Sequence, residues 1–344
     1  MKKYFSLFLF ILVSFLAGGD RFVSNAGKNL AQTDQPKPEL VLQTGHSRSV
    51  QSVAFSPDNK WVASGSFDNT IKIWDFATGR ELRALDGHTG TVKTLDYSTD
   101  GQLLASGGND KTVRIWNVSS GAEIKSLTVE GGSVEKLAVS SDGGKISAGV
   151  SDGKIYVWEV SSGRELFKFT EHTAAVTALE FNRDGTLLVS GSADNVIKIR
   201  DLNKGKRVEE LKGHTDKIEV LRFSSNGDTL ASGSADKTVR LWKTSNGRKL
   251  TVLEGHKSKV LAINFTADGK IMSADSAQNI KAWDPQNKRE INSVSASDGK
   301  DAVIEAETAA FSSDGKFLAS GKGDRTVVLA DAQTGERLNT LENR

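Results

Sequence analysis

Apolar and polar residues alternate in short runs along most of the chain, a pattern typical of β-strands. The first group of runs predicts four strands: Ser49 to Phe55, Trp61 to Ser66, Thr70 to Trp74 and Glu81 to Leu85. Turn-forming residues separate these runs, and the pattern has no helical periodicity. The sequence therefore predicts a four-stranded unit built from consecutive hairpins.

This unit recurs with a period of 42 residues. All five histidines keep the period, with Glu130 in the one skipped place: His46, His88, His172, His214 and His256. Tryptophans follow it too, as Trp74, Trp116, Trp158 and Trp242, with Arg200 in one slot, Trp283 one residue early and Ala330 seventh. An Asp-Gly or Asn-Gly pair marks the first turn of every later repeat, as hairpin turns with positive φ favour. Such repeats predict a closed ring of four-stranded sheets.

With these repeats the chain resembles the WD-repeat β-propeller family, whose repeat opens with Gly-His and closes with Trp-Asp. Gly45-His46 and Trp74-Asp75 match this pattern, whereas Trp116-Asn117 shows how the ending drifts. The resemblance implies an all-β fold, a seven-bladed propeller with four antiparallel strands per blade, over residues 39–344. Fold alone says little about function.

The resemblance also implies a hydrogen-bonded network in each blade, because buried polar groups need partners. Its members are a histidine before the first strand, a serine on the second, an aspartate in the next turn and a tryptophan on the third. Three blades supply full sets: His46, Ser64, Asp68 and Trp74; His88, Ser106, Asp110 and Trp116; His214, Ser232, Asp236 and Trp242. Other blades depart from the set: Glu130 and Ala148 in blade three, Arg200 in blade four, Ala277 at the aspartate position of blade six, and Ala302 and Ala330 in blade seven.

The chain begins with Lys2, Lys3 and an apolar run from Tyr4 to Ala17. The run is shorter than the roughly 20 residues that span a bilayer as a helix, and a basic start before it is typical of a secretory signal. We predict a signal peptide in residues 1–26, with an uncleaved membrane anchor as the alternative, and a polar linker in residues 27–38. An exported protein, periplasmic or secreted, is the expectation, with membrane contact only if this segment stays uncleaved.

The composition of the chain argues against several kinds of functional site. The 344 residues include no cysteine, which excludes disulfides and thiolate metal sites. Lysine and arginine number 45 against 43 acidic residues, a balance with no global attraction to nucleic acid. Phosphate-loop, zinc-protease and EF-hand motifs do not occur. We therefore predict no cofactor, no metal site and no nucleic-acid partner.

Histidine, serine and aspartate are also the residue types of a hydrolase triad. Every histidine falls at one phase of the repeat, however, whereas a catalytic site needs one distinct constellation. The sequence therefore favours a non-catalytic scaffold for binding other proteins. The alternatives are an exported propeller that binds carbohydrate or another cell-envelope component, and, less favoured, a carboxylate-dependent enzyme acting on glycosides.

In the family, partners dock on the face that carries the loops before the first strand and between the second and third strands. From the positions that the resemblance places there, we predict a partner site of seven residues: Phe67, Lys93, Lys217, Lys259, Leu261, Glu305 and Glu307. Exposed aromatic residues often anchor interfaces, although isolated ones are also ordinary on protein surfaces. The loop between Ile291 and Val303 is five residues longer than the period predicts, and we expect it to contribute to binding.

Two segments compete for the outermost strand of the last blade. Glu39 to Gln43 and Glu336 to Leu341 both alternate as a strand does. We favour the N-terminal segment, because joining the two ends of the chain would lock the ring. The C-terminal segment would then add outside it, remain unpaired or pair with another molecule.

Overall fold

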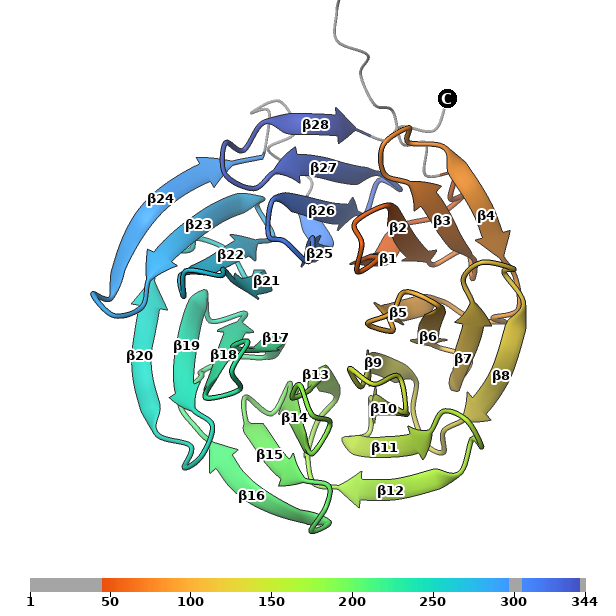
Figure 1. Cartoon of the computed structure of the whole chain (residues 1–344), viewed down its shortest axis with the longest axis horizontal. Coiled ribbons are helices and arrows are strands. Elements are labelled where there is room, and N and C mark those ends of the chain that lie inside the picture. Colours follow the sequence, from red (N-terminus) through yellow and green to blue (C-terminus); the bar gives the residue numbers. More distant parts are fainter. Residues whose placement is uncertain (1–44, 297–304, 341–344) are drawn as a thin grey trace, which may run out of the picture. The chain divides into compact units, whose positions relative to one another are not determined.

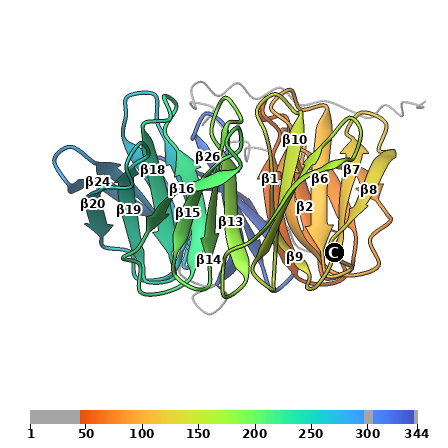
Figure 2. The same cartoon turned by 90° about the horizontal axis from the view of Figure 1, so that it is seen from below.

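The computed structural model describes residues 45–296 and 305–340. These residues form 28 strands in seven four-stranded antiparallel sheets, arranged as blades around a common axis (Figures 1 and 2). The described part of the chain contains no helix, and thus none that could cross a membrane. The predicted all-β, seven-bladed propeller is confirmed. The predicted signal segment and linker, residues 1–38, lie outside the described residues.

Each blade uses four consecutive strands, and the first lies nearest the axis (Figure 1). Blades one and two contain β1 (Val50–Phe55), β2 (Trp61–Ser66), β3 (Ile71–Asp75), β4 (Glu81–Leu85), β5 (Val92–Tyr97), β6 (Leu103–Gly108), β7 (Thr112–Asn117) and β8 (Glu123–Thr128). Blades three and four contain β9 (Val134–Val139), β10 (Lys145–Val150), β11 (Lys154–Glu159), β12 (Glu165–Thr170), β13 (Val176–Phe181), β14 (Leu187–Ser192), β15 (Ile197–Asp201) and β16 (Lys206–Leu211). Blades five to seven contain β17 (Ile218–Phe223), β18 (Thr229–Ser234), β19 (Thr238–Lys243), β20 (Lys249–Glu254), β21 (Val260–Phe265), β22 (Ile271–Asp275), β23 (Asn279–Asp284), β24 (Arg289–Ser295), β25 (Ala306–Phe311), β26 (Phe317–Lys322), β27 (Val327–Asp331) and β28 (Arg337–Thr340).

Adjacent blades pack through a glycine on the second strand of one blade and a branched residue that opens the first strand of the next. A Cβ on Gly65 would lie 2.6 Å from the Cγ1 atom of Val92, so only glycine allows this approach. The same contact recurs at four further junctions and at the closing one: Gly107–Val134, Gly149–Val176, Gly191–Ile218, Gly233–Val260 and Gly321–Val50. At the remaining junction Ala274 and Ala306, both buried, occupy the two positions. The repeat thus encodes the spacing between blades.

The ring closes between blades seven and one. Val50 packs against Gly321, and the Ser49 hydroxyl donates a hydrogen bond of 2.6 Å to the Gly323 carbonyl oxygen. At the other end of this junction, where the first strands of the two blades end, the Ser313 hydroxyl donates a bond of 2.8 Å to the carbonyl oxygen of Pro57. Closure therefore rests on side-chain packing and hydrogen bonds between complete blades.

The outermost strand of the last blade comes from the C-terminal segment. β28 pairs with β27 as the fourth strand of its sheet, so the preference for Glu39 to Gln43 in that place was wrong. That N-terminal segment itself lies outside the described residues. A short turn joins β27 to β28, and closing it costs less chain entropy than pairing β27 with the distant start of the chain.

The turn before β28 allows a direct test. Gly335 has a φ of +73°, and a Cβ there would lie 2.7 Å from the carbonyl oxygen of Ser295 in blade six. Gly143 has a similar φ of +67°, but its Cβ would meet no atom within 4 Å. We expect Gly143→Ala to lower the free energy of unfolding by about 1 kcal/mol, from the left-handed backbone alone. Gly335→Ala should lower it clearly more in urea unfolding, and equal losses would contradict this placement of β28.

Candidate functional site

The histidine, serine, aspartate and tryptophan of one blade form a continuous hydrogen-bonded chain. In blade one, Trp74 Nε1 donates a 2.9 Å bond to Ser64 Oγ, which lies 2.8 Å from His46 Nε2. His46 Nδ1 lies 2.9 Å from Asp68 Oδ2. Two further blades repeat the arrangement with distances of 2.7 to 2.8 Å: His88, Ser106, Asp110 and Trp116, and His214, Ser232, Asp236 and Trp242.

The protonation states of the histidine and the aspartate determine which atoms donate and which accept in this hydrogen-bonded network. Burial lowers the pKa of His88 even though Asp110 opposes that effect, so the imidazole is neutral at neutral pH. Burial alone would raise the pKa of Asp68, but hydrogen bonds from His46 and Thr70 outweigh it and hold the pKa far below its usual value. A neutral imidazole then donates from Nδ1 to the carboxylate and accepts the serine proton at Nε2. Each donor in the chain has one acceptor, and the Ser64 side chain is fully buried.

Blade six completes the same network with a residue that the sequence comparison of repeats missed. Asp275 Oδ2 lies 3.0 Å from His256 Nδ1, Ser273 Oγ lies 2.6 Å from Nε2, and Trp283 Nε1 donates a bond of 2.7 Å to that oxygen. The prediction that Ala277 leaves this blade without an aspartate was wrong.

The carboxylate of blade six reaches the histidine from a different backbone position. Asp275 ends β22, whereas Asp68 lies in the turn after β2. The backbone N–H and the side-chain amide of Asn279 both donate to Asp275 Oδ1, at 2.9 and 3.0 Å. The sequence did contain a signal for this role, because Asp275 lies two residues after Ser273, the serine of the network.

This assignment yields a stability prediction. Asp275→Ala leaves the His256 Nδ1 proton and the Asn279 amide without their buried acceptor, so we expect a loss of about 2 kcal/mol or more in the free energy of unfolding. Ala277→Ser, at the position that the sequence pattern indicates, should change it by less than about 0.5 kcal/mol. Chemical unfolding of both variants is the measurement, and similar values would contradict the role of Asp275.

Two incomplete blades contain substitutes of their own. In blade three the Tyr156 hydroxyl donates a 3.2 Å bond to the Glu130 carbonyl oxygen, and its ring stacks on Trp158 with centroids 5.4 Å apart. Tyr156 is paired with Ala148 across the sheet, where a small residue leaves room for the ring. The polar bond and the aromatic packing occupy the place of the absent histidine and serine.

Blade four exchanges its tryptophan for Arg200, which lies 3.7 Å from the Phe169 ring centroid and bonds the Glu171 carboxylate. Glu171 stands where most repeats have glycine. In blade two a Cβ on Gly87 would lie 3.0 Å from Trp116, so a glutamate there would crowd the tryptophan. In blade four the two departures from the repeat form one ion pair.

We call the face at which the first strands begin the histidine face, and the face at which they end the turn face. On the histidine face, Phe67 lies in the turn after β2 and is 40% exposed. Lys259 and Leu261, at the start of β21, are partly exposed, and Glu305 and Glu307, at the start of β25, are exposed. Blades six, seven and one are neighbours in the ring (Figure 1), so these five residues share one sector.

The two other predicted partner residues are already engaged in ion pairs. Lys93 Nζ lies 2.7 Å from Glu135 of blade three, and Lys217 Nζ lies 2.9 Å from Glu219. The Glu305 carboxylate accepts a 2.7 Å bond from the Ser276 hydroxyl, which joins blade seven to blade six. Most of the loop that was expected to contribute to binding, residues 297–304, lies outside the described residues.

Sequence reasoning also missed a row of charged residues along the central cavity, which has a volume of about 430 Å³. Four consecutive first strands contribute alternating charges, Asp96, Lys136, Glu180 and Arg222. The carboxylates also link blades, because Asp96 accepts a 2.8 Å bond from the backbone N–H of Val139 in the next blade. Glu180 does the same at Phe223, at 3.1 Å, and lies 3.4 Å from Arg222 Nη1.

Glu180 gives the fold a pH dependence. Burial raises its pKa from 4.5 to about 7, although Arg222 and the Phe223 N–H oppose the shift. The folded carboxyl keeps its proton to higher pH than the unfolded one. Its contribution to stability is therefore complete below the ordinary pKa and is lost as the pH rises through about 7.

Glu180→Gln removes this titration while it keeps a hydrogen-bond acceptor. We expect the melting temperature of the variant, relative to the parent, to increase between about pH 5 and about pH 8. Thermal unfolding across this range measures it. A difference that stays constant with pH would show that Glu180 titrates equally in the folded and unfolded chains.

A family model described as WD domain, G-beta repeat matches the sequence seven times: residues 37–75, 79–117, 121–159, 163–201, 205–243, 247–284 and 291–331. The chain belongs to the WD-repeat family. Within the part of this WD-repeat chain that the structure describes, no group of three or more histidine or acidic residues is placed to hold a metal ion.

Curated relatives match short stretches of this WD-repeat chain. A pre-mRNA-splicing factor of Yarrowia lipolytica is 45% identical over 62 residues, 17% of this chain and 14% of the relative. A ribosome biogenesis protein of Drosophila virilis is 43% identical over 51 residues, 15% of this chain and 6% of the relative. Ribosome assembly protein 4 of Saccharomyces cerevisiae is 49% identical over 41 residues, 12% and 8% respectively. The chain thus spans only a small part of each relative's length.

The names of these relatives contradict the predicted location. Splicing of pre-mRNA and ribosome assembly take place inside cells, so the expectation of an exported protein, periplasmic or secreted, was wrong. That expectation rested on one apolar run of 14 residues. Runs of this length occur in buried segments of proteins as well as in export signals, so composition alone does not distinguish them.

Proposed function

We propose that this WD-repeat protein is a non-catalytic scaffold that binds another protein on its histidine face, in the sector formed by blades six, seven and one. Family membership supports a role in protein binding. The relatives that it matches are named as factors in splicing and in ribosome assembly, processes carried out by large complexes.

The exposure of Phe67 carries this proposal. Six large apolar side chains are exposed in the described part of the chain. Five of them recur on the outer strands of different blades: Leu82, Ile124, Val208, Leu250 and Ile291. Phe67 is the aromatic one and lies on the histidine face, in the same sector as the acidic residues Glu305 and Glu307 of blade seven. A partner with an apolar pocket and an adjacent basic group suits this surface.

The internal networks support the absence of catalysis. Each histidine pairs with a carboxylate of its own blade at 2.7 to 3.0 Å, and no histidine ring is more than slightly exposed. The serine of each network already accepts an indole N–H or is buried beneath the strands, as Ser64 is. A substrate would have to displace the core of a blade to reach these groups.

Affinity capture tests the proposed surface. Phe67→Ala combined with Glu307→Lys removes the apolar anchor and reverses a neighbouring charge, so we expect proteins captured from an extract of the source cells to be lost, as quantified by mass spectrometry. The matched control is Leu82→Ala, which also truncates an exposed apolar side chain but on the outer strand β4. Capture of the same proteins by parent, double variant and control would contradict the assignment of the surface.

A further inference from the structure

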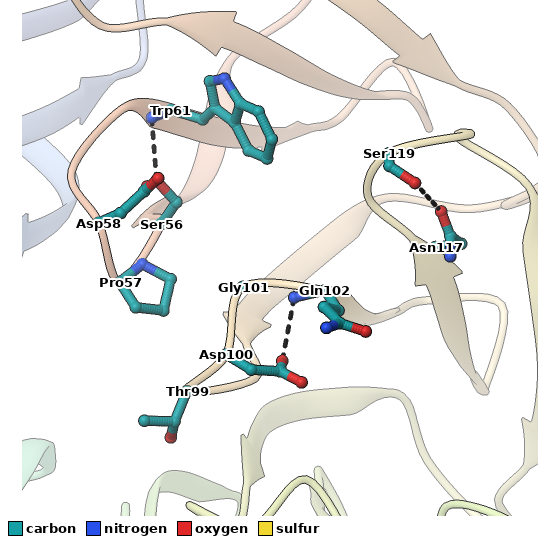
Figure 3. Close-up of a pocket in the computed structure, with 10 residues that line it drawn as sticks. All are labelled: Ser56, Pro57, Asp58, Trp61, Thr99, Asp100, Gly101, Gln102, Asn117 and Ser119. Carbon is teal, nitrogen blue, oxygen red and sulfur yellow. Dashed lines mark hydrogen bonds between the residues drawn. The ribbon is translucent and has the colours of Figure 1, made fainter.

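A pocket of about 610 Å³ opens on the turn face between blades one and two (Figure 3). Two first turns form much of it, Ser56 to Asp58 in blade one and Thr99 to Gln102 in blade two. The lining is completed by Trp61 at the start of β2, Asn117 at the end of β7 and Ser119 in the turn that follows. The pocket lies on the face opposite to the proposed partner site.

The lining of this pocket is acidic. It includes the carboxylates of Asp58 and Asp100 and no lysine or arginine. Asp100 Oδ1 accepts bonds from the Ser98 hydroxyl at 2.6 Å and from the Gln102 backbone N–H at 3.0 Å. These bonds, the Ser98 one above all, hold the pKa of Asp100 below its usual value, so the group is an anion at neutral pH.

Asp100 differs from its equivalents in blades one, six and seven, where a lysine two residues later neutralises the aspartate. Lysine Nζ and aspartate Oδ2 are 3.1 Å apart in Lys60–Asp58, 2.6 Å in Lys270–Asp268 and 3.3 Å in Lys316–Asp314. In blade two the lysine position is Gln102, and the described residues give Asp100 no ion pair. A negative charge therefore faces the pocket without an internal cation.

Trp61 is the second departure from the repeat, because it lies outside the 42-residue series of tryptophans. Its equivalents include Leu103, Leu187 and Phe317. The side chain packs partly against the core between blades one and two and is only partly buried. Figure 3 shows the indole on one side of the pocket and the turn with Asp100 and Gln102 on another.

We propose that this pocket binds an arginine side chain from an extended segment of a partner protein, with the guanidinium stacked on Trp61 and paired with Asp100. A guanidinium is planar and weakly hydrated, stacks on aromatic rings and offers several N–H donors to carboxylate and amide oxygens. The Gln102 side chain supplies a further acceptor at the same turn. This site goes beyond the proposed function, because a scaffold with a second site on its turn face can hold two partners at once.

The test uses short peptides and the full-length protein. The probe is acetyl-Gly-Ser-Arg-Ser-Gly-amide, and its control is the same peptide with citrulline, which keeps the shape and removes the charge. Binding is followed by the NMR signal of the Trp61 indole N–H, assigned with Trp61→Phe. We expect the arginine peptide to shift this signal in a saturable way and the citrulline peptide to bind about tenfold more weakly or not at all.

Three variants locate the site. Asp100→Asn should keep the turn, because Asn226 accepts the equivalent serine bond in blade five at 2.8 Å. We expect this variant to weaken peptide binding about tenfold. Gln102→Lys installs the lysine found in blades one, six and seven and should abolish binding. Asp142→Asn alters the corresponding turn of blade three, away from Trp61, and should leave binding unchanged.

Several outcomes would overturn the inference. One is the absence of any saturable Trp61 shift with the arginine peptide, and another is equal binding of the citrulline peptide. A third is equal weakening by Asp100→Asn and Asp142→Asn, which would indicate nonspecific charge attraction. A fourth is a comparable shift with the neutral disaccharide cellobiose, which would indicate a sugar site. Phe67→Ala should not affect peptide binding, so failure here is distinct from failure of the histidine-face proposal.

Discussion

The architecture depends on the close approach between the second strand of each blade and the first strand of the next. Gly65 makes room for Val92, and the same glycine contact ends with Gly321 against Val50, where the ring closes. A side chain at any of these glycines would meet the neighbouring blade, so the same glycine contact sets the spacing at six of the seven junctions. At the junction between blades six and seven, Ala274 and Ala306 replace both the glycine and the branched residue. Paired changes also occur elsewhere: Glu171 forms an ion pair with Arg200, and Ala148 leaves room for the ring of Tyr156.

This repetition separates structural residues from residues available for binding. The histidines, their serines and their aspartates are used within blades, and the glycines and branched residues are used between them. The surfaces proposed for binding consist of departures from the repeat instead. Phe67 is an exposed aromatic among turn residues that are mostly small. Trp61 and Gln102 line a pocket with a pair of residues that no other junction between blades combines.

The sequence was sufficient for the fold because the histidines and tryptophans mark the period and the turns mark the strand ends. The predicted strands of blade one agree with the structure to within one residue, with Val50 instead of Ser49 as the first residue of β1. Asp275 was missed because alignment compares backbone positions, whereas a carboxylate can reach the same imidazole from two of them. The outer strand of blade seven was misassigned because two segments alternate equally well, and only the short turn at Gly335 decides between them. The charges along the central cavity were missed because a bulge after Val50 and its equivalents determines which side chains face the axis.

The central claim is that the repeated residues hold the blades together while departures from the repeat bind partners. The most direct measurement compares Ser64→Ala and Phe67→Ala for both urea unfolding and capture of partner proteins, with capture performed where both variants are folded. The account predicts that Ser64→Ala lowers the free energy of unfolding by about 1–3 kcal/mol, because it removes the buried hydrogen bonds that join His46 and Trp74 to Ser64 Oγ. The variant should capture the same proteins as the parent. Phe67→Ala should retain the stability and lose the capture. Loss of capture by folded Ser64→Ala, or full capture by Phe67→Ala, would contradict it.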